Sequence, residues 1–205
     1  MEKAELLRKL GATVEKVKPA SIVDKSQFVN LARQRAEENG FGIFADQFEN
    51  EENWKVHLRT TGPEIYRQCG GKLDAFVSGA GIILHICFFF QRGLTKGTGG
   101  TISGVAEYLL QRLPGLLVVL ADPQGSGLYN SIKYGVMYSS TEKEGTRRRH
   151  QVDSLVEGIG INRLTRNFAK GRPHINEAVK VTDAMAVGMG RWLIKNDGTI
   201  FIISH

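Results

Sequence analysis

The chain has 205 residues and a formal net charge of +6, with 41% hydrophobic and 23% charged residues. This balance is typical of a soluble globular protein, and it excludes a disordered, collagen-like or mainly membrane-embedded chain. The two cysteines are too few for a disulfide framework and lack metal-ligand spacing. We therefore expect no metal site, and an intracellular reducing compartment, either the cytoplasm or a mitochondrion.

Two local patterns could suggest a membrane or a nucleic acid as a partner, but both are weak. The apolar stretch "IILHICFFF", residues 82–90, has about half the length needed to span a bilayer and contains a histidine. The basic run "TRRRH", residues 146–150, has no aromatic residues interleaved with its arginines. We therefore expect no membrane span and no nucleic-acid partner.

The N-terminal part of the chain predicts two helices and two short strands. "EKAELLRKLGATVEKV" predicts a helix that a glycine stops, followed by a strand. "DKSQFVNLARQRAEENG" predicts a second helix, with Asp24 as its N-cap and Gly40 just past its end. "FGIFAD" then predicts a short strand.

Further along the chain, strands and helices alternate. This alternation is typical of an α/β fold in which a parallel sheet has helices on both faces. In chain order, the segments are a helix "GPEIYRQC", a strand "LDAFVSGAG", a helix "TISGVAEYLLQRL", a buried strand "GLLVVLADP", a short strand around Val179 to Val181, and a helix from Asp183.

The most site-like element is the turn "GTGGT", which comprises Gly97, Thr98, Gly99, Gly100 and Thr101 and leads into a predicted helix. Backbone N–H groups at a helix N-terminus converge on anions, and the helix dipole favours negative charge there. Glycines allow close approach, and threonine hydroxyls add donors. The turn therefore indicates a phosphate site, although glycines that serve only to turn the chain are the simpler alternative.

Several motifs in a fixed order carry a family resemblance. "DQFENEENWKVHLRTTGPEIYRQCGGKLDAFVSGAG", "GTGGTISGVAEYLL", "VVLADPQGSGLY" and "VEGIGINRLTRNF" together resemble the cysteine synthase (O-acetylserine sulfhydrylase) and cystathionine β-synthase family. These are pyridoxal-phosphate enzymes of fold type II, the group similar to the tryptophan synthase β-chain. Apart from one interruption, the resemblance runs from Glu2 to Gly198.

The resemblance implies a fold, a domain division and site residues. It implies a fold type II sheet with a partial N-terminal lobe, residues 1–44, and a larger pyridoxal-phosphate-binding lobe, residues 45–205. The family's glycine loop holds the cofactor phosphate, which here means Gly97, Thr98, Gly99, Gly100 and Thr101. Gln47 corresponds to a glutamine near the substrate carboxylate, and Gly158, Ile159 and Gly160 correspond to a segment lining the far side of the cofactor. The alternatives are a surface glutamine and a simple turn.

The implied activity is the replacement of the acetoxy group of O-acetylserine by sulfide to give cysteine and acetate, in a homodimer acting on a small amino-acid substrate. The related cystathionine-forming reaction and a non-catalytic phosphate-binding remnant are the alternatives. The family's Schiff-base lysine lies in a segment before the part that this chain resembles. We therefore assign no catalytic residue, regard His57 as structural, and expect this chain alone to be inactive.

One segment interrupts the family pattern. The family's glycine loop is continuous, so Gly81 is expected to join directly to Thr98, and residues 82–97 are an insertion. One hypothesis is a translated, unspliced intron, with a second such event giving the divergent tail after Gly198. The alternative is a genuine loop insertion, which surface loops tolerate.

Overall fold

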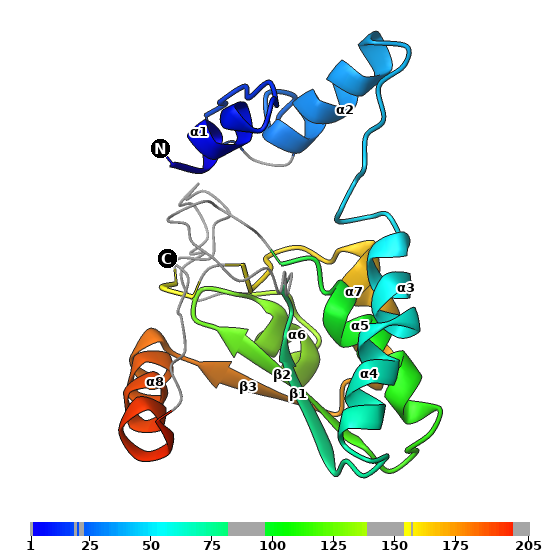
Figure 1. Ribbon diagram of the computed structural model, residues 1–205, viewed down its shortest axis with the longest axis vertical. Coiled ribbons are helices and arrows are strands. Elements are labelled where there is room, and N and C mark those ends of the chain that lie inside the picture. Colours follow the sequence, from blue (N-terminus) through cyan, green and yellow to red (C-terminus); the bar gives the residue numbers. More distant parts are fainter. Residues whose placement is uncertain are drawn as a thin grey trace.

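The computed structural model describes residues 2–18, 20, 23–81, 97–138, 154–156 and 158–198; in this part of the chain a parallel sheet is flanked by helices (Figure 1). The strands are β1 (Ala75–Gly79), β2 (Leu117–Pro123) and β3 (Glu177–Val181). The helices are α1 (Glu2–Lys9), α2 (Phe28–Glu38), α3 (Glu52–Arg59), α4 (Thr61–Gln68), α5 (Gly100–Leu110), α6 (Leu128–Tyr134), α7 (Arg166–Gly171), the 3-10 turn η1 (Arg172–His174) and α8 (Asp183–Asp197).

The sheet has the strand order β1-β2-β3, and both pairings are parallel. Val77 of β1 lies opposite Val119 of β2, which in turn lies opposite Glu177 of β3. Because parallel strands need crossover connections, α5 lies between β1 and β2 in the sequence, and α6 and α7 lie between β2 and β3. The predicted α/β fold with a parallel sheet is confirmed.

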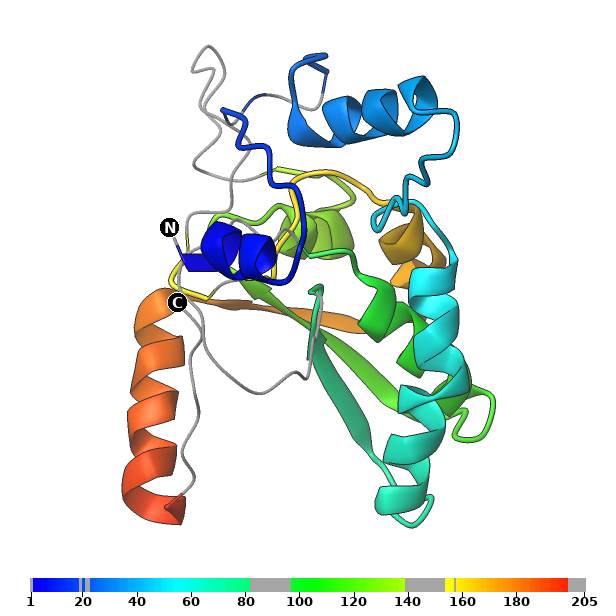
Figure 2. The same ribbon diagram turned by 45° about the horizontal axis from the view of Figure 1, so that its top comes forward.

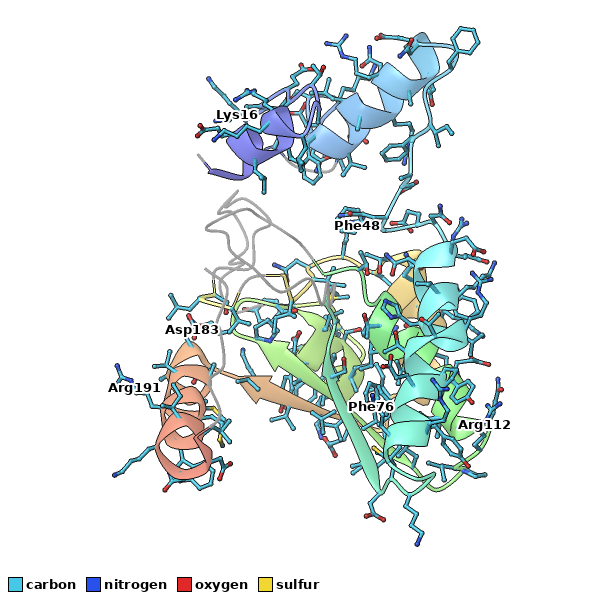
Figure 3. All side chains as sticks on the ribbon, viewed as in Figure 1. Lys16, Phe48, Phe76, Arg112, Asp183 and Arg191 are labelled. Carbon is cyan, nitrogen blue, oxygen red and sulfur yellow. The ribbon has the colours of Figure 1, made fainter. Side chains whose placement is uncertain are left out.

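The core lies on one face of this sheet. Phe76 of β1, Val118 of β2 and Ala178 of β3 belong to one apolar cluster with side chains from α5, α6 and α7. In Figure 3, Phe76 extends from β1 toward the neighbouring helices. The largest fully buried members include Ile102 of α5 and Phe168 of α7. Since apolar burial is the main favourable term in folding, this layer holds the sheet and the first turn of α5 together.

The opposite face of the sheet is much less covered. Val77 is 61% exposed and Val179 is 44% exposed, although both are β-branched apolar residues suited to a buried strand. Helix α8 lies on the other side of the sheet from α3, α4 and α5 (Figures 1 and 2), but none of its residues is buried. Helices therefore flank the sheet on both sides, while only one face carries a packed core.

The two strands predicted in the N-terminal part do not form. Residues 12–18 after α1 and residues 42–46 after α2 are irregular, although α1 and α2 themselves lie where the sequence predicts helices. A strand is stable only where a neighbouring strand takes its backbone hydrogen bonds. Within the described residues, no strand pairs with either segment. The proposed lobe boundary at residue 44 stays a prediction.

Helix caps differ from those that the sequence suggests. Gln27, not Asp24, is the N-cap of α2, since the Gln27 side chain accepts a hydrogen bond from the Val29 amide at 2.7 Å. Asp24 lies three residues before this cap. Its carboxylate accepts hydrogen bonds from the amide and the hydroxyl of Ser26 and so closes a local turn. Gly40 follows α2 with a positive φ of 60°, as expected for a residue just past a helix end.

Some sequence-based hypotheses concern residues outside the described part. Residues 82–96 of the interrupting segment, the basic run at 146–150, Glu157 and the tail after Gly198 belong to this group. Among the described helices, none is both long and apolar enough to cross a lipid bilayer.

Asp122 is a fully buried carboxyl at the end of β2. Its Oδ2 accepts a hydrogen bond from the Tyr129 amide of α6 at 2.7 Å, whereas its Oδ1 has no partner. Burial raises the pKa of Asp122 to about 6, because the charged form loses its hydration, and hydrogen bonds from Ser126 and the Tyr129 amide only partly oppose this. The carboxyl thus ties β2 to α6 at an electrostatic cost near neutral pH.

We predict that Asp122→Asn flattens the dependence of stability on pH between about pH 4 and 6. A folded-state pKa above the ordinary 3.8 means that the folded protein binds the proton more tightly, so stability is greatest below that range and falls as the pH rises through about 6. The loss should be of the order of 2 kcal/mol. Urea unfolding across this range measures it, with Asp74→Asn at an exposed turn as the control. An unchanged slope in the Asp122 variant would contradict the assignment.

Candidate functional site

The glycine turn lies where the sequence predicts, at the N-terminus of α5. Gly99 is the N-cap residue and has a positive φ of 78°, and Gly100 begins the helix. Thr98 and Thr101 are both almost completely buried. Because the first amides of a helix have no partner within the helix, this turn presents donors and the positive end of the helix dipole. Its geometry suits an anion.

The glycines of this turn also have a packing role. A Cβ on Gly100 would collide with Asn53 Oδ1 of α3, and a Cβ on Gly104 would lie 2.8 Å from the Cβ of His57. A Cβ on Gly99 would lie 2.8 Å from the Phe168 Cα of α7. Real Cβ atoms essentially never make contacts this short, so a side chain at any of these positions would force a neighbouring group to shift even without a ligand. The absence of side chains lets α3 and α7 approach the first turn of α5.

Asn53 joins two parts of the candidate site. Its Oδ1 accepts a long hydrogen bond from the Thr98 hydroxyl at 3.3 Å, and its Nδ2 donates to the Gln47 carbonyl at 2.9 Å. The Thr98 hydroxyl also accepts from the Gly100 amide at 3.3 Å. Asn53 thereby connects the backbone at Gln47 to the glycine turn through a single side chain.

The segment around Gln47 is held from a second direction by α7 and the loop before it. Asn167 Nδ2 donates to the Gln47 carbonyl at 3.1 Å and to the Phe48 carbonyl at 2.7 Å. The Glu49 carboxylate accepts from Arg163 at 2.6 Å and from the Arg166 amide at 2.9 Å. Phe48 is buried where the chain coming from α2 reaches α3 (Figure 3). The Gln47 side chain is exposed on this fixed backbone, so it is available to a ligand.

Glu49 shows how firmly this segment is held. Although partial burial opposes ionisation, the hydrogen bonds from Arg163 and the Arg166 amide, with the charge of Arg163, hold the pKa of Glu49 below its ordinary value. The Arg163 guanidinium also lies 4.9 Å from the centre of the Phe48 ring. The Gln47 segment is thus fixed by charge as well as by amide hydrogen bonds.

Residues 158–160 lie beside the end of β1. Ile159 forms an antiparallel bridge with Gly81, and the Gly160 amide donates to the Ala80 carbonyl at 3.1 Å. Gly158 and Gly160 both have a positive φ, at 82° and 90°. A Cβ on Gly97 would lie 2.9 Å from the Gly81 Cα, so the glycine turn adjoins the same residues. The structure therefore brings 158–160 close to the glycine turn.

His57 connects α3 and α4 to α5. Its Nδ1 lies 2.9 Å from the Thr61 hydroxyl, and its Nε2 lies 3.2 Å from the Thr101 hydroxyl. Burial lowers the pKa of His57, because the imidazolium would lose its hydration. Thr60 is the N-cap residue of α4, but its side chain makes no capping hydrogen bond, since its hydroxyl donates to the Val56 carbonyl at 2.7 Å.

The side chains that join these elements were not found from the sequence. Asn53, Asn167 and Thr165 are ordinary polar residues by type, and Thr165 donates to the Thr98 carbonyl at 2.7 Å across a long separation in the chain. The segment "ENWKVHLR" of α3 carried a helical signal that could have placed Asn53 and His57 on one element. No group of three or more His, Cys, Asp or Glu within the described residues could hold a metal ion.

Comparison with known proteins identifies relatives of this chain. A family model described as "Pyridoxal-phosphate dependent enzyme" matches residues 1–87. Over 97% of its length the chain is 57% identical to "Cysteine synthase 2" of Neurospora crassa, covering 42% of that protein. It is 54% identical, over 97% of its length, to a candidate mitochondrial cysteine synthase of Saccharomyces cerevisiae, covering 48% of it. A "Cystathionine beta-synthase" of Oryctolagus cuniculus is 30% identical over 98% of this chain and 31% of its own length.

These matches confirm the resemblance that the motifs indicate. The identity to these two cysteine synthases is much higher than that to the cystathionine β-synthase. The chain spans less than half the length of each of these relatives.

We predict that removing residues 82–97 leaves the fold intact. Gly81 and Gly97 already lie side by side, so joining Gly81 to Thr98 needs only a small local shift. Shortening a loop also lowers the entropic cost of closing it, although only by about 0.6 kcal/mol for each halving. Thermal unfolding should give a melting temperature equal to or above that of the full chain. Loss of a cooperative transition would show that the segment is needed for folding.

We predict that Gly100→Ala is destabilising because of Asn53. Since Gly100 does not have a positive φ, the added methyl group is opposed by the Asn53 side chain and not by backbone strain. Such overpacking costs about 1–3 kcal/mol. Asn53→Ala should relieve most of that cost in the double variant, and a double-mutant cycle of urea unfolding measures the coupling. Additive effects would mean that the two residues do not restrict each other.

Proposed function

We propose that this chain, a relative of the cysteine synthases in the pyridoxal-phosphate-dependent enzyme family, forms the phosphate-binding part of an enzyme that makes cysteine from O-acetylserine and sulfide. In this reaction sulfide replaces the acetate group at the β-carbon, and acetate leaves. The observation that carries the proposal is the assembly of the glycine turn, the Gln47 segment and residues 158–160 around the ends of β1 and α5.

The residues present fit the phosphate of the cofactor. The turn offers a positive-φ glycine at the N-cap, helix amides without intrahelical partners, and the hydroxyls of Thr98 and Thr101. We propose that Gly97 to Thr101 hold the phosphate, and that Gly158, Ile159 and Gly160 lie along the cofactor. When bound, pyridoxal phosphate supplies an electron-withdrawing ring that stabilises negative charge on the α-carbon of the substrate.

Gln47 is proposed to contact the substrate carboxylate. Its amide is exposed, and its backbone carbonyl is fixed by Asn53 and Asn167. A side-chain amide can donate to a carboxylate, and a fixed backbone leaves only the side chain to be ordered on binding. This role requires the two hydrogen bonds to the Gln47 carbonyl, because they hold the Gln47 segment at a fixed position relative to the glycine turn.

The cystathionine-forming reaction is the less favoured alternative, because the sequence identity to cysteine synthases is higher. A homodimer and an intracellular location are further proposals that rest on the family and on the exposed free thiol of Cys69. The segments of this chain that resemble the family do not include its Schiff-base lysine. We therefore propose that the chain alone binds the phosphate group but does not make cysteine.

The test uses pyridoxine 5′-phosphate, which lacks the aldehyde and so cannot react with lysines, and pyridoxine, which lacks the phosphate. We expect the phosphorylated compound to bind at least about tenfold more tightly in calorimetry, since hydrogen bonds to a charged group contribute about 1.5–3 kcal/mol. Gly99→Ala should abolish this difference, because Gly99 has a positive φ and lies against Phe168. Gly115→Ala has open space around it and should have no effect.

A second arm tests turnover. The chain is mixed with pyridoxal phosphate, O-acetylserine and sulfide, and the cysteine formed is measured. A parallel sample is reduced with borohydride, and peptide mapping identifies any lysine that carries a pyridoxyl group. We expect no cysteine above background and no stoichiometric pyridoxyl adduct on a single lysine. Equal binding of the two pyridoxine compounds would refute the phosphate site, and turnover with one modified lysine would show that the chain is a complete catalyst.

A further inference from the structure

We propose that His57 is a positioning residue that donates a hydrogen bond from Nε2 to the Thr101 hydroxyl oxygen and thereby frees the Thr101 proton for an anion at the N-terminus of α5. The chain of donors would run from the Thr61 hydroxyl to His57 Nδ1, from His57 Nε2–H to Thr101 Oγ1, and from the Thr101 hydroxyl to a phosphate oxygen. This inference rests on the proposed phosphate site and adds a residue that lies outside the glycine turn.

The geometry allows two arrangements of protons. His57 lies between two hydroxyls, with Thr61 Oγ1 at 2.9 Å from Nδ1 and Thr101 Oγ1 at 3.2 Å from Nε2. A neutral imidazole carries one N–H, so one ring nitrogen donates and the other accepts. If Nδ1 carries the proton, Thr101 must donate to His57 and has no proton left. If Nε2 carries it, Thr61 donates to Nδ1 and the Thr101 proton is free.

Near pH 7 the imidazole of His57 is in its neutral form. His57 is half-buried, and burial lowers its pKa below the ordinary value, so near pH 7 the ring holds a single proton. No carboxylate hydrogen-bonds either ring nitrogen, since both nitrogens face threonine hydroxyls. The hydroxyls can each donate or accept, so the ligand decides the arrangement.

A phosphate at the α5 N-terminus favours the Nε2–H arrangement. A phosphate dianion accepts hydrogen bonds only, so an approaching hydroxyl must present its proton, not its lone pairs. The Thr98 hydroxyl differs in this respect, because it donates to Asn53 Oδ1. Thr101 is the first-turn threonine whose hydroxyl contacts His57 Nε2. When Nε2 donates to that hydroxyl, the Thr101 proton is free for the phosphate. Comparing Thr101→Val with Thr98→Val therefore distinguishes the hydroxyl that contacts His57 from the one that contacts Asn53, although both residues belong to the proposed phosphate site.

Two substitutions of His57 separate its donor from its bulk. The side-chain amide of glutamine can place an N–H near the position of Nε2, whereas the shorter asparagine amide reaches only the region of Nδ1. If donation to Thr101 is what matters, His57→Gln should keep phosphate affinity within about twofold and His57→Asn should lose about tenfold, the usual size of one charge-assisted hydrogen bond. A purely structural role would not rank these two variants in this way.

The experiment has two readouts on the full chain. Long-range proton–nitrogen NMR, with the His57 signals assigned by their loss in His57→Gln, reports which ring nitrogen carries the proton with pyridoxine 5′-phosphate bound. Calorimetry then compares pyridoxine 5′-phosphate with pyridoxine for the wild-type chain and for His57→Gln, His57→Asn, Thr101→Val and Thr98→Val. We expect Nε2–H in the bound state, about tenfold weaker binding for His57→Asn and for Thr101→Val, and no further loss when those two changes are combined.

The outcomes separate the two proposals. Protonation at Nδ1 in the bound state overturns the positioning role, as does phosphate-dependent binding that His57→Asn leaves unchanged or that Thr98→Val weakens more than Thr101→Val. If the wild-type chain does not distinguish pyridoxine 5′-phosphate from pyridoxine, the proposed phosphate site itself fails, and the role of His57 fails with it. Circular dichroism of each variant identifies any that do not fold, and Thr101→Val, a nearly isosteric change, then carries the comparison.

Discussion

The close approach of α3 to the first turn of α5 is the constraint on which the rest of the site depends. Gly100 and Gly104 make it possible, since side chains there would collide with Asn53 and His57. Because α3 then lies directly against the glycine turn, its polar side chains reach both threonines of that turn. The same glycines that suit a phosphate therefore serve a second purpose, the packing of two helices, and either role alone would select against larger residues.

From this contact a single hydrogen-bonded network extends across the molecule. Asn53 joins the glycine turn to the Gln47 carbonyl, and Asn167 of α7 holds the same carbonyl from the other side. Ser103 of α5 donates to the Asn167 carbonyl at 2.7 Å, which closes the connection back to α5. Buried polar groups that are paired in this way fix one arrangement, because any alternative leaves a group without a partner. Substrate and phosphate elements are thus positioned together.

The described part of the fold is unevenly stabilised. One face of the sheet packs against α5, α6 and α7, while Val77 and Val179 on the other face stay exposed and α8 buries none of its residues. The segments predicted as strands in the N-terminal part are irregular in the absence of a pairing strand among the described residues. These features share one cause: extended and apolar segments need a second surface to become ordered.

The sequence by itself determined the alternation of strands and helices, the glycine turn at Gly97 to Thr101, and the family, because periodicity, turn residues and motif order are local properties of the chain. It did not determine the strand pairing near the N-terminus, the Gln27 cap, or the links from Thr98 to Asn53 and from Thr101 to His57. Only the tertiary structure decided these, since a polar side chain of common type carries no local signal of its partner. The packing of α3 on α5 brings together residues more than forty positions apart.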